Sequence, residues 1–134
     1  MNDYEKLLAE FENELTFKFR SDMPDGLPAI IIDSTIYINQ HLPYKEAITY
    51  LVEEIGHFKT LADGIDIIDQ TNIFNRRLEV KGREWGYRKL VPKEKLLEFI
   101  AKRDSVMEYE IAEEFGVPDK YAREVLKMYQ IKGR

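Results

Sequence analysis

The spacing of apolar residues along the chain changes abruptly near Pro43. Before it, Leu15, Phe17 and Phe19 alternate with polar residues, which is the spacing of a strand with one buried face. After it, apolar residues recur every three or four positions as far as Leu61, which is the spacing of an amphipathic helix. A chain that separates its strands from its helices in this way is expected to be an α+β protein.

The part before Pro43 predicts one short helix and a small sheet. Apolar residues at helical spacing indicate a helix over 3–14. Residues 21–28 contain two prolines and a glycine and are typical of a turn. Two β-branched runs separated by Asp33-Ser34 indicate a tight hairpin. Three strands are therefore expected, at 15–20, 29–32 and 36–38.

The part after Pro43 predicts helices joined by short breaks. A long helix over 44–61 is followed by an acidic linker over 62–71. Further helices are expected at 72–90, 93–103, 108–115 and 119–129. The last two flank Gly116-Val117-Pro118 and have the spacing of a helix-turn-helix unit. We therefore expect a main domain over 1–103 and a helix-turn-helix-like tail over 104–134 that packs on it.

Composition excludes several classes of site. The absence of cysteine excludes disulfides, cysteine-bound zinc, iron–sulfur clusters and a thiol nucleophile, and it fits a cytoplasmic protein. No apolar run approaches the roughly 18–20 residues that span a bilayer, and the acidic N-terminal segment does not resemble a signal peptide. The net charge of −5 is divided unevenly, with −6 over residues 1–60 and +6 over residues 76–103. Most of these charges are interpreted as solvated helix faces.

The long helix contains Glu53-Glu54-Ile55-Gly56-His57. Glu53 and His57 are four positions apart and lie on one helix face, with Glu54 beside them. This spacing matches the zincin motif H-E-x-x-H, with Glu53 in place of the first histidine. Carboxylate oxygen also ligates zinc. Gly56 strengthens this interpretation over a solvated pair of acids, because a glycine inside a helix often marks a close backbone approach.

A third ligand is expected from the next helix, and Glu79 is the best candidate. Gly82 and Gly86 follow Glu79 by three and seven positions, so they form a stripe of small residues on the same helix face. Small residues on one face allow two helices to press together, which would bring Glu79 to the motif. The alternative is that Glu79 is one more exposed acid.

These blocks of sequence resemble the ImmA/IrrE family of metallopeptidases, and the small phage and prophage branch most closely. The resemblance rests on the hairpin strand and on the two helices that hold the motif and Glu79. The matching segments are Tyr37–Asn39, Tyr50–Thr60 and Asn75–Pro92. Their order along the chain is more specific than any one motif, and the resemblance extends to the tail.

The resemblance implies a minimal zincin-like core with zinc as cofactor. It implies Glu53, His57 and Glu79 as metal ligands and Glu54 as the catalytic general base that takes a proton from water. The family's usual first histidine is Glu53 here, and a set of one nitrogen and two carboxylates also suits manganese or iron. The oxyanion donor stays open among Tyr44, Tyr50 and Tyr87, and His41 is either an extra ligand or a surface histidine.

Two functions follow from the resemblance. The first is a metal-dependent endopeptidase of a phage or mobile element that cleaves a regulatory protein, such as a helix-turn-helix repressor. The alternative is a non-catalytic relative that regulates by binding a repressor or DNA. We expect the tail to dock protein and not DNA, because Glu108, Glu110, Glu113 and Glu114 would face the phosphates beside a last helix of net charge +1. No membrane partner is expected.

Overall fold

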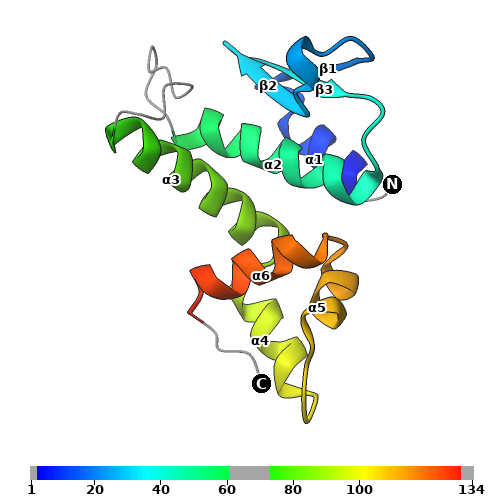
Figure 1. The fold of residues 1–134 in the computed structure, drawn as a ribbon, viewed down its shortest axis with the longest axis vertical. Coiled ribbons are helices and arrows are strands. Elements are labelled where there is room, and N and C mark those ends of the chain that lie inside the picture. Colours follow the sequence, from blue (N-terminus) through cyan, green and yellow to red (C-terminus); the bar gives the residue numbers. More distant parts are fainter. Residues whose placement is uncertain (1–2, 61–72, 131–134) are drawn as a thin grey trace.

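The computed structural model describes residues 3–60 and 73–130, and side chains from residue 79 onward in the second range. These residues form an α+β fold of six helices and a small three-stranded sheet, as predicted (Figure 1). The predicted linker over 62–71 and the side chains of 73–78 lie outside the described residues. The elements are α1 (Asp3–Phe11), β1 (Thr16–Arg20), the short 3₁₀ helix η1 (Pro24–Gly26), β2 (Ala29–Ile32), β3 (Thr35–Asn39), α2 (Tyr44–Thr60), α3 (Ile73–Leu90), α4 (Lys93–Ala101), α5 (Glu108–Phe115) and α6 (Asp119–Met128).

The sheet has β3 at its centre. β2 pairs with β3 antiparallel and β1 pairs with it parallel, so that β1 and β2 form the two edges. Asp33-Ser34 forms the turn between β2 and β3, and Asp33 has a φ of 55°. Aspartate tolerates this left-handed conformation better than most residues. The predicted hairpin is confirmed, and the parallel pairing of β1 is an additional feature.

The sheet and α1 pack against one side of α2, where the first core forms (Figure 1). Ile36 and Ile38 of β3 are almost fully buried, as are Leu51 and Ile55 of α2. The alternation along β3 and the helical spacing along α2 bring these side chains to a shared interface. The rest of this core consists of Leu7, Phe11, Leu15, Ile48 and Val52.

Helix α3 packs closely along α2, and glycines make this contact possible. A Cβ atom on Gly56 would lie 2.1 Å from the carbonyl oxygen of Gly82. On Gly82 it would lie 2.2 Å from Nδ1 of His57, and on Gly86 2.9 Å from Cγ2 of Val52. Any side chain at Gly56 or Gly82 would therefore separate the two helices. The close approach predicted from this glycine stripe is present.

A second core joins the end of α3 to α4, α5 and α6. Tyr87 and Val91 contribute to it from the α3 end, together with Leu96 and Phe99 of α4. Its members on the last two helices and their connection are Ile111, Ala112, Val117, Ala122, Val125 and Leu126. Gly116 ends α5 in the left-handed conformation, with φ of 68°, which glycine adopts without a steric penalty. The division of the chain at residue 103 stays a prediction, and α4 shares its core with α5 and α6.

None of the described helices is both long and apolar enough to cross a membrane.

Candidate metal centre

Helix α2 places Glu53 and His57 one turn apart at the edge of the first core. His57 is only 2% exposed, and Glu53 is partly buried. The apolar residues of α2 on either side pack the helix against the sheet. The edge with Glu53 and His57 then faces α3. The motif therefore lies at the contact between two helices and not on a solvated face.

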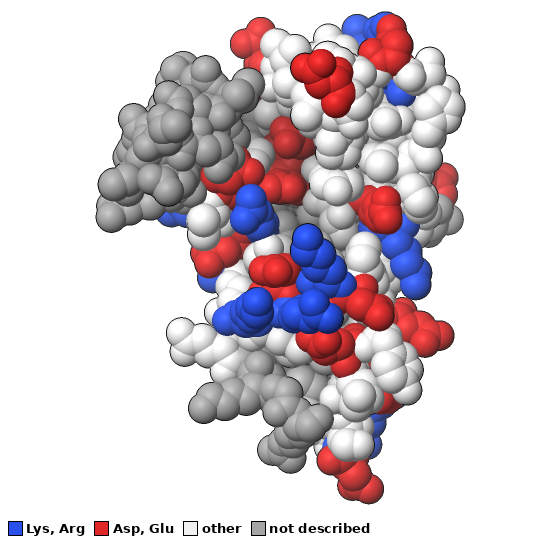
Figure 2. Space-filling view, viewed as in Figure 1, with Lys and Arg blue, Asp and Glu red and all other residues white. Residues whose placement is uncertain are grey.

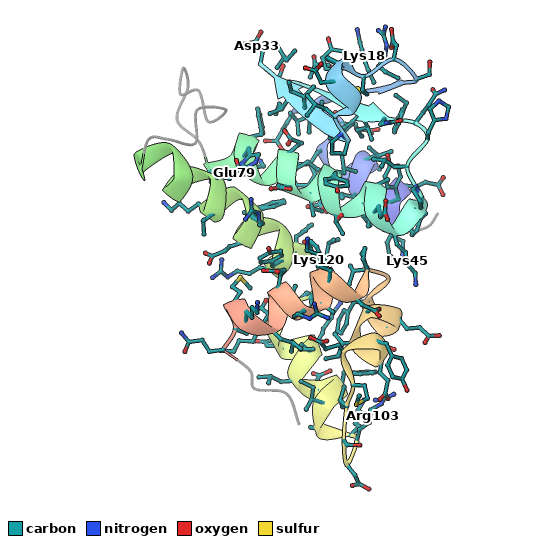
Figure 3. All side chains as sticks on the ribbon, viewed as in Figure 1. Lys18, Asp33, Lys45, Glu79, Arg103 and Lys120 are labelled. Atoms are coloured by element: carbon teal, nitrogen blue, oxygen red, sulfur yellow. The ribbon has the colours of Figure 1, made fainter. Side chains whose placement is uncertain are left out.

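Helix α3 brings Glu79 to this edge (Figure 3). Nε2 of His57 lies 3.3 Å from Oε2 of Glu79. One potential ligand atom from each of Glu53, His57 and Glu79 lies within 4.8 Å of the others. The structure thus brings together the three side chains that the sequence singled out. Their role as metal ligands stays a prediction.

The pKa values of the three groups of this triad shift in different directions. Burial raises the pKa of Glu53, and the charge of Glu79 raises it further while Arg83 opposes the shift. The hydrogen bond with His57 lowers the pKa of Glu79 despite its burial. Burial alone would lower the pKa of His57, but the hydrogen bond to Glu79 and the surrounding carboxylates raise it above its ordinary value. The triad is therefore an anionic site that attracts a proton or another cation.

Glu54 lies beside the triad and turns toward the sheet. Burial raises the pKa of its carboxyl to about 7, against the opposing charge of His57 and a hydrogen bond from the backbone of Ile31 in β2. A carboxyl group whose pKa lies near neutrality can both accept and return a proton. Acidic side chains lie in the recess between the sheet and α3 in Figure 2.

Arg83 also belongs to the site, and the sequence reasoning missed it. Its Nε lies 3.3 Å from Oε1 of Glu53, and its Nη2 lies 3.4 Å from Oε1 of Glu79. The signal was present in the sequence, because Arg83 follows Glu79 by four residues and so shares its helix face. Arg83 is not a metal ligand, so a search for ligating residue types does not identify it.

The donor set fits a divalent cation. Zinc bonds of about 2.0–2.2 Å place two ligand atoms at most about 4.4 Å apart, so the triad is at or close to ligand geometry. The imidazole presents Nε2 to the carboxylates, whereas its buried Nδ1 has no hydrogen-bond partner among the described residues. Nδ1 faces Gly82. Packing against α3, and not a second hydrogen bond, therefore orients the ring.

A cavity of about 360 Å³ adjoins the triad between α2, α3 and α6. Glu53 and Arg83 line it next to the triad, and Lys120 and Tyr121 line it from α6. Lys120 lies where α6 approaches α2 and α3 in Figure 3. The helix-turn-helix-like tail therefore contributes part of the surface around the candidate centre. Its other lining residues are Glu46, Thr49, Tyr50, Tyr87, Pro118 and Glu124.

The remaining candidates separate into near and distant residues. Tyr50 and Tyr87 line the cavity beside Glu53. Tyr44 instead accepts a hydrogen bond from the backbone of Tyr4, at the opposite end of α2. His41 is exposed, and its backbone amide donates to the Asn39 side chain. Tyr44 and His41 are thus outside the triad and the cavity beside it.

Comparison with protein families gives a match over almost the whole chain. The model of the IrrE N-terminal-like domain, Peptidase_M78, matches residues 4–127. The matched range includes the sheet, both helices of the triad and both helices of the tail. Comparisons with curated proteins and with solved structures gave no matches. The chain therefore belongs to the Peptidase_M78 family of IrrE N-terminal-like domains.

Proposed function

We propose that this protein is a metal-dependent endopeptidase that cleaves a regulatory protein, with a cytoplasmic helix-turn-helix repressor of a phage or other mobile element as its substrate. The observation that carries the proposal is the convergence of Glu53, His57 and Glu79 within 4.8 Å, next to a carboxyl group at Glu54 with a raised pKa. Membership of a metallopeptidase-like family supports it. The choice of a repressor rests on the resemblance described above.

The triad would hold the cation, and zinc is the metal we propose first. Its imidazole nitrogen and two carboxylates also suit manganese or iron, which accept oxygen ligands readily. A bound divalent cation supplies Lewis acidity, which polarises a peptide carbonyl and makes water more acidic. Glu54 would accept the proton from the attacking water and return it to the departing amine. Its pKa of about 7 suits both transfers.

The surroundings of Glu54 suit an extended peptide. β2 is an edge strand of the described sheet, and its Ile31 backbone lies next to the Glu54 carboxylate. Edge strands present backbone groups that can pair with an added strand. A substrate segment paired with β2 would pass beside Glu54, and the cavity lined by Tyr50 and Tyr87 would be available to one of its side chains.

Cleavage of purified repressors tests this proposal. The protein is loaded with Zn²⁺ or Mn²⁺ and incubated with helix-turn-helix repressors, and the products are identified by mass spectrometry. We expect cleavage at a defined internal bond that stops with EDTA and resumes when the metal is restored. A stable complex without cleavage under every metal condition would contradict the proposal and support the non-catalytic alternative.

We predict that the tail does not bind DNA tightly. Arg123 of α6 is paired with Glu108 of α5, with Nε 3.1 Å from Oε2, and Lys120 lines the cavity. Basic side chains over α6 are interspersed with acidic ones in Figure 2. Binding to duplex DNA at physiological salt should therefore stay at about 10⁻⁴ M or weaker, without sequence preference. A gel-shift titration measures this, and tight, sequence-selective binding that depends on Lys120, Arg123 and Lys127 would contradict it.

A further inference from the structure

The metal triad already has a cation of the protein's own beside it. Arg83 contacts Oε1 of both carboxylates, at 3.3 Å from Glu53 and 3.4 Å from Glu79. Among the side chains that the structure describes, it is the arginine or lysine paired with the triad. Its guanidinium therefore occupies the position where positive charge lowers the repulsion between two adjacent carboxylates.

We propose that Arg83 is an internal cation that competes with the metal for Glu53 and Glu79, and thereby sets the affinity of the site. This inference rests on the proposed metal-dependent function. With Arg83 present, these two carboxylates and the guanidinium sum to −1. Without Arg83 they sum to −2, and a more negative set of oxygen ligands binds a divalent cation more tightly.

The surroundings of Arg83 allow it to leave. The side chain is 44% exposed and borders the 360 Å³ cavity, so the guanidinium has room to move away from the carboxylates. Glu46 and Glu124 line the same cavity and offer other carboxylates. An arginine that only fixed the orientation of the ligands would be expected to be enclosed and tightly bonded, whereas both contacts here are long for charged hydrogen bonds.

The competing role and an orienting role predict opposite results for Arg83→Gln. If Arg83 competes with the metal, its removal strengthens metal binding and destabilises the metal-free protein. If Arg83 holds Glu53 and Glu79 in place for the metal, its removal weakens metal binding. Because Arg83 is exposed, salt screens its charge, and the difference from wild type should shrink as the salt concentration rises.

The experiment is a Zn²⁺ titration of the metal-free full chain against a chromophoric chelator, with thermal unfolding in EDTA as a second readout. We expect Arg83→Gln to bind Zn²⁺ about tenfold more tightly than wild type at low salt and to unfold at a lower temperature in EDTA. Arg83→Lys, which retains the charge, should bind within about threefold of wild type.

Arg88→Gln is the matched control. Arg88 lies on the same helix, is exposed, and is 3.9 Å from Glu84, so the variant removes one positive charge away from the triad. Its Zn²⁺ affinity should equal that of wild type. Equal or weaker Zn²⁺ binding by Arg83→Gln would overturn the inference while leaving the proposed function intact. Failure of both wild type and Arg83→Gln to bind Zn²⁺ would contradict both proposals.

Discussion

Gly56→Ala should destabilise the protein by about 3 kcal/mol or more. The new Cβ atom would lie 2.1 Å from the carbonyl oxygen of Gly82, and this atom belongs to the backbone of α3. Neither helix backbone can yield locally, so α2 and α3 would have to separate. Overpacking a tight core costs typically 1–3 kcal/mol, and contact with backbone is at the upper end of that range. Urea unfolding, followed by circular dichroism, measures the change.

Gly86→Ala is the control for this prediction. There the new Cβ atom would meet Cγ2 of the buried Val52 side chain at 2.9 Å, so Val52 has to move, but the three nearest atoms all belong to side chains and none to the backbone. At both positions alanine favours a helix interior by about 1 kcal/mol over glycine, which offsets part of each cost. Gly86→Ala should therefore destabilise the protein by at most about 2 kcal/mol, which is less than the loss expected for Gly56→Ala. Equal destabilisation by both substitutions would show that the contact between Gly56 and Gly82 is not the decisive one.

Glu54→Gln should remove peptide cleavage while the metal still binds. Glutamine has nearly the same shape as glutamate, but its amide cannot accept the proton of the attacking water. General acid–base catalysis contributes about 10²–10⁴-fold, and the rate of repressor cleavage should fall by that factor. Initial rates measured by mass spectrometry at saturating metal give the comparison.

The metal content separates this effect from loss of the site. Glu54 contributes none of the three converging ligand atoms. Glu54→Gln should therefore contain as much Zn²⁺ as wild type by elemental analysis. Cleavage at the wild-type rate by Glu54→Gln would show that another group accepts the proton. Lost activity together with lost metal would instead place Glu54 among the ligands.

Periodicity predicted most of the fold. The alternation in 15–20, the β-branched runs at 29–32 and 36–38 and the helical spacing after Pro43 located the strands and helices to within a few residues. Each pattern identifies the type of an element, but it does not always identify the buried side chains, since Phe19 of β1 is 44% exposed although the alternation placed it on a buried face. Periodicity does not show which strands lie next to each other in the sheet, so the parallel pairing of β1 with β3 could not be derived from it.

The site was predictable where helix geometry was sufficient. Glu53 and His57 share a face of one helix, and the glycines on α3 indicated that Glu79 could approach them. The contribution of α6 to the cavity depends instead on how the second core positions the tail, and no local pattern encodes that arrangement. The pairing of Arg83 with two carboxylates on different helices likewise depends on tertiary contact.

Zinc binding by wild type and Glu79→Gln tests the central claim most directly. Glu79 is the proposed ligand that only the tertiary fold brings to Glu53 and His57, and glutamine preserves its size. Isothermal titration of the metal-free proteins should give one Zn²⁺ per wild-type chain and an affinity at least about 100-fold weaker for Glu79→Gln, since each ligand of a three-residue site is essential. Equal stoichiometry and affinity in the two proteins would contradict a metal centre formed by Glu53, His57 and Glu79.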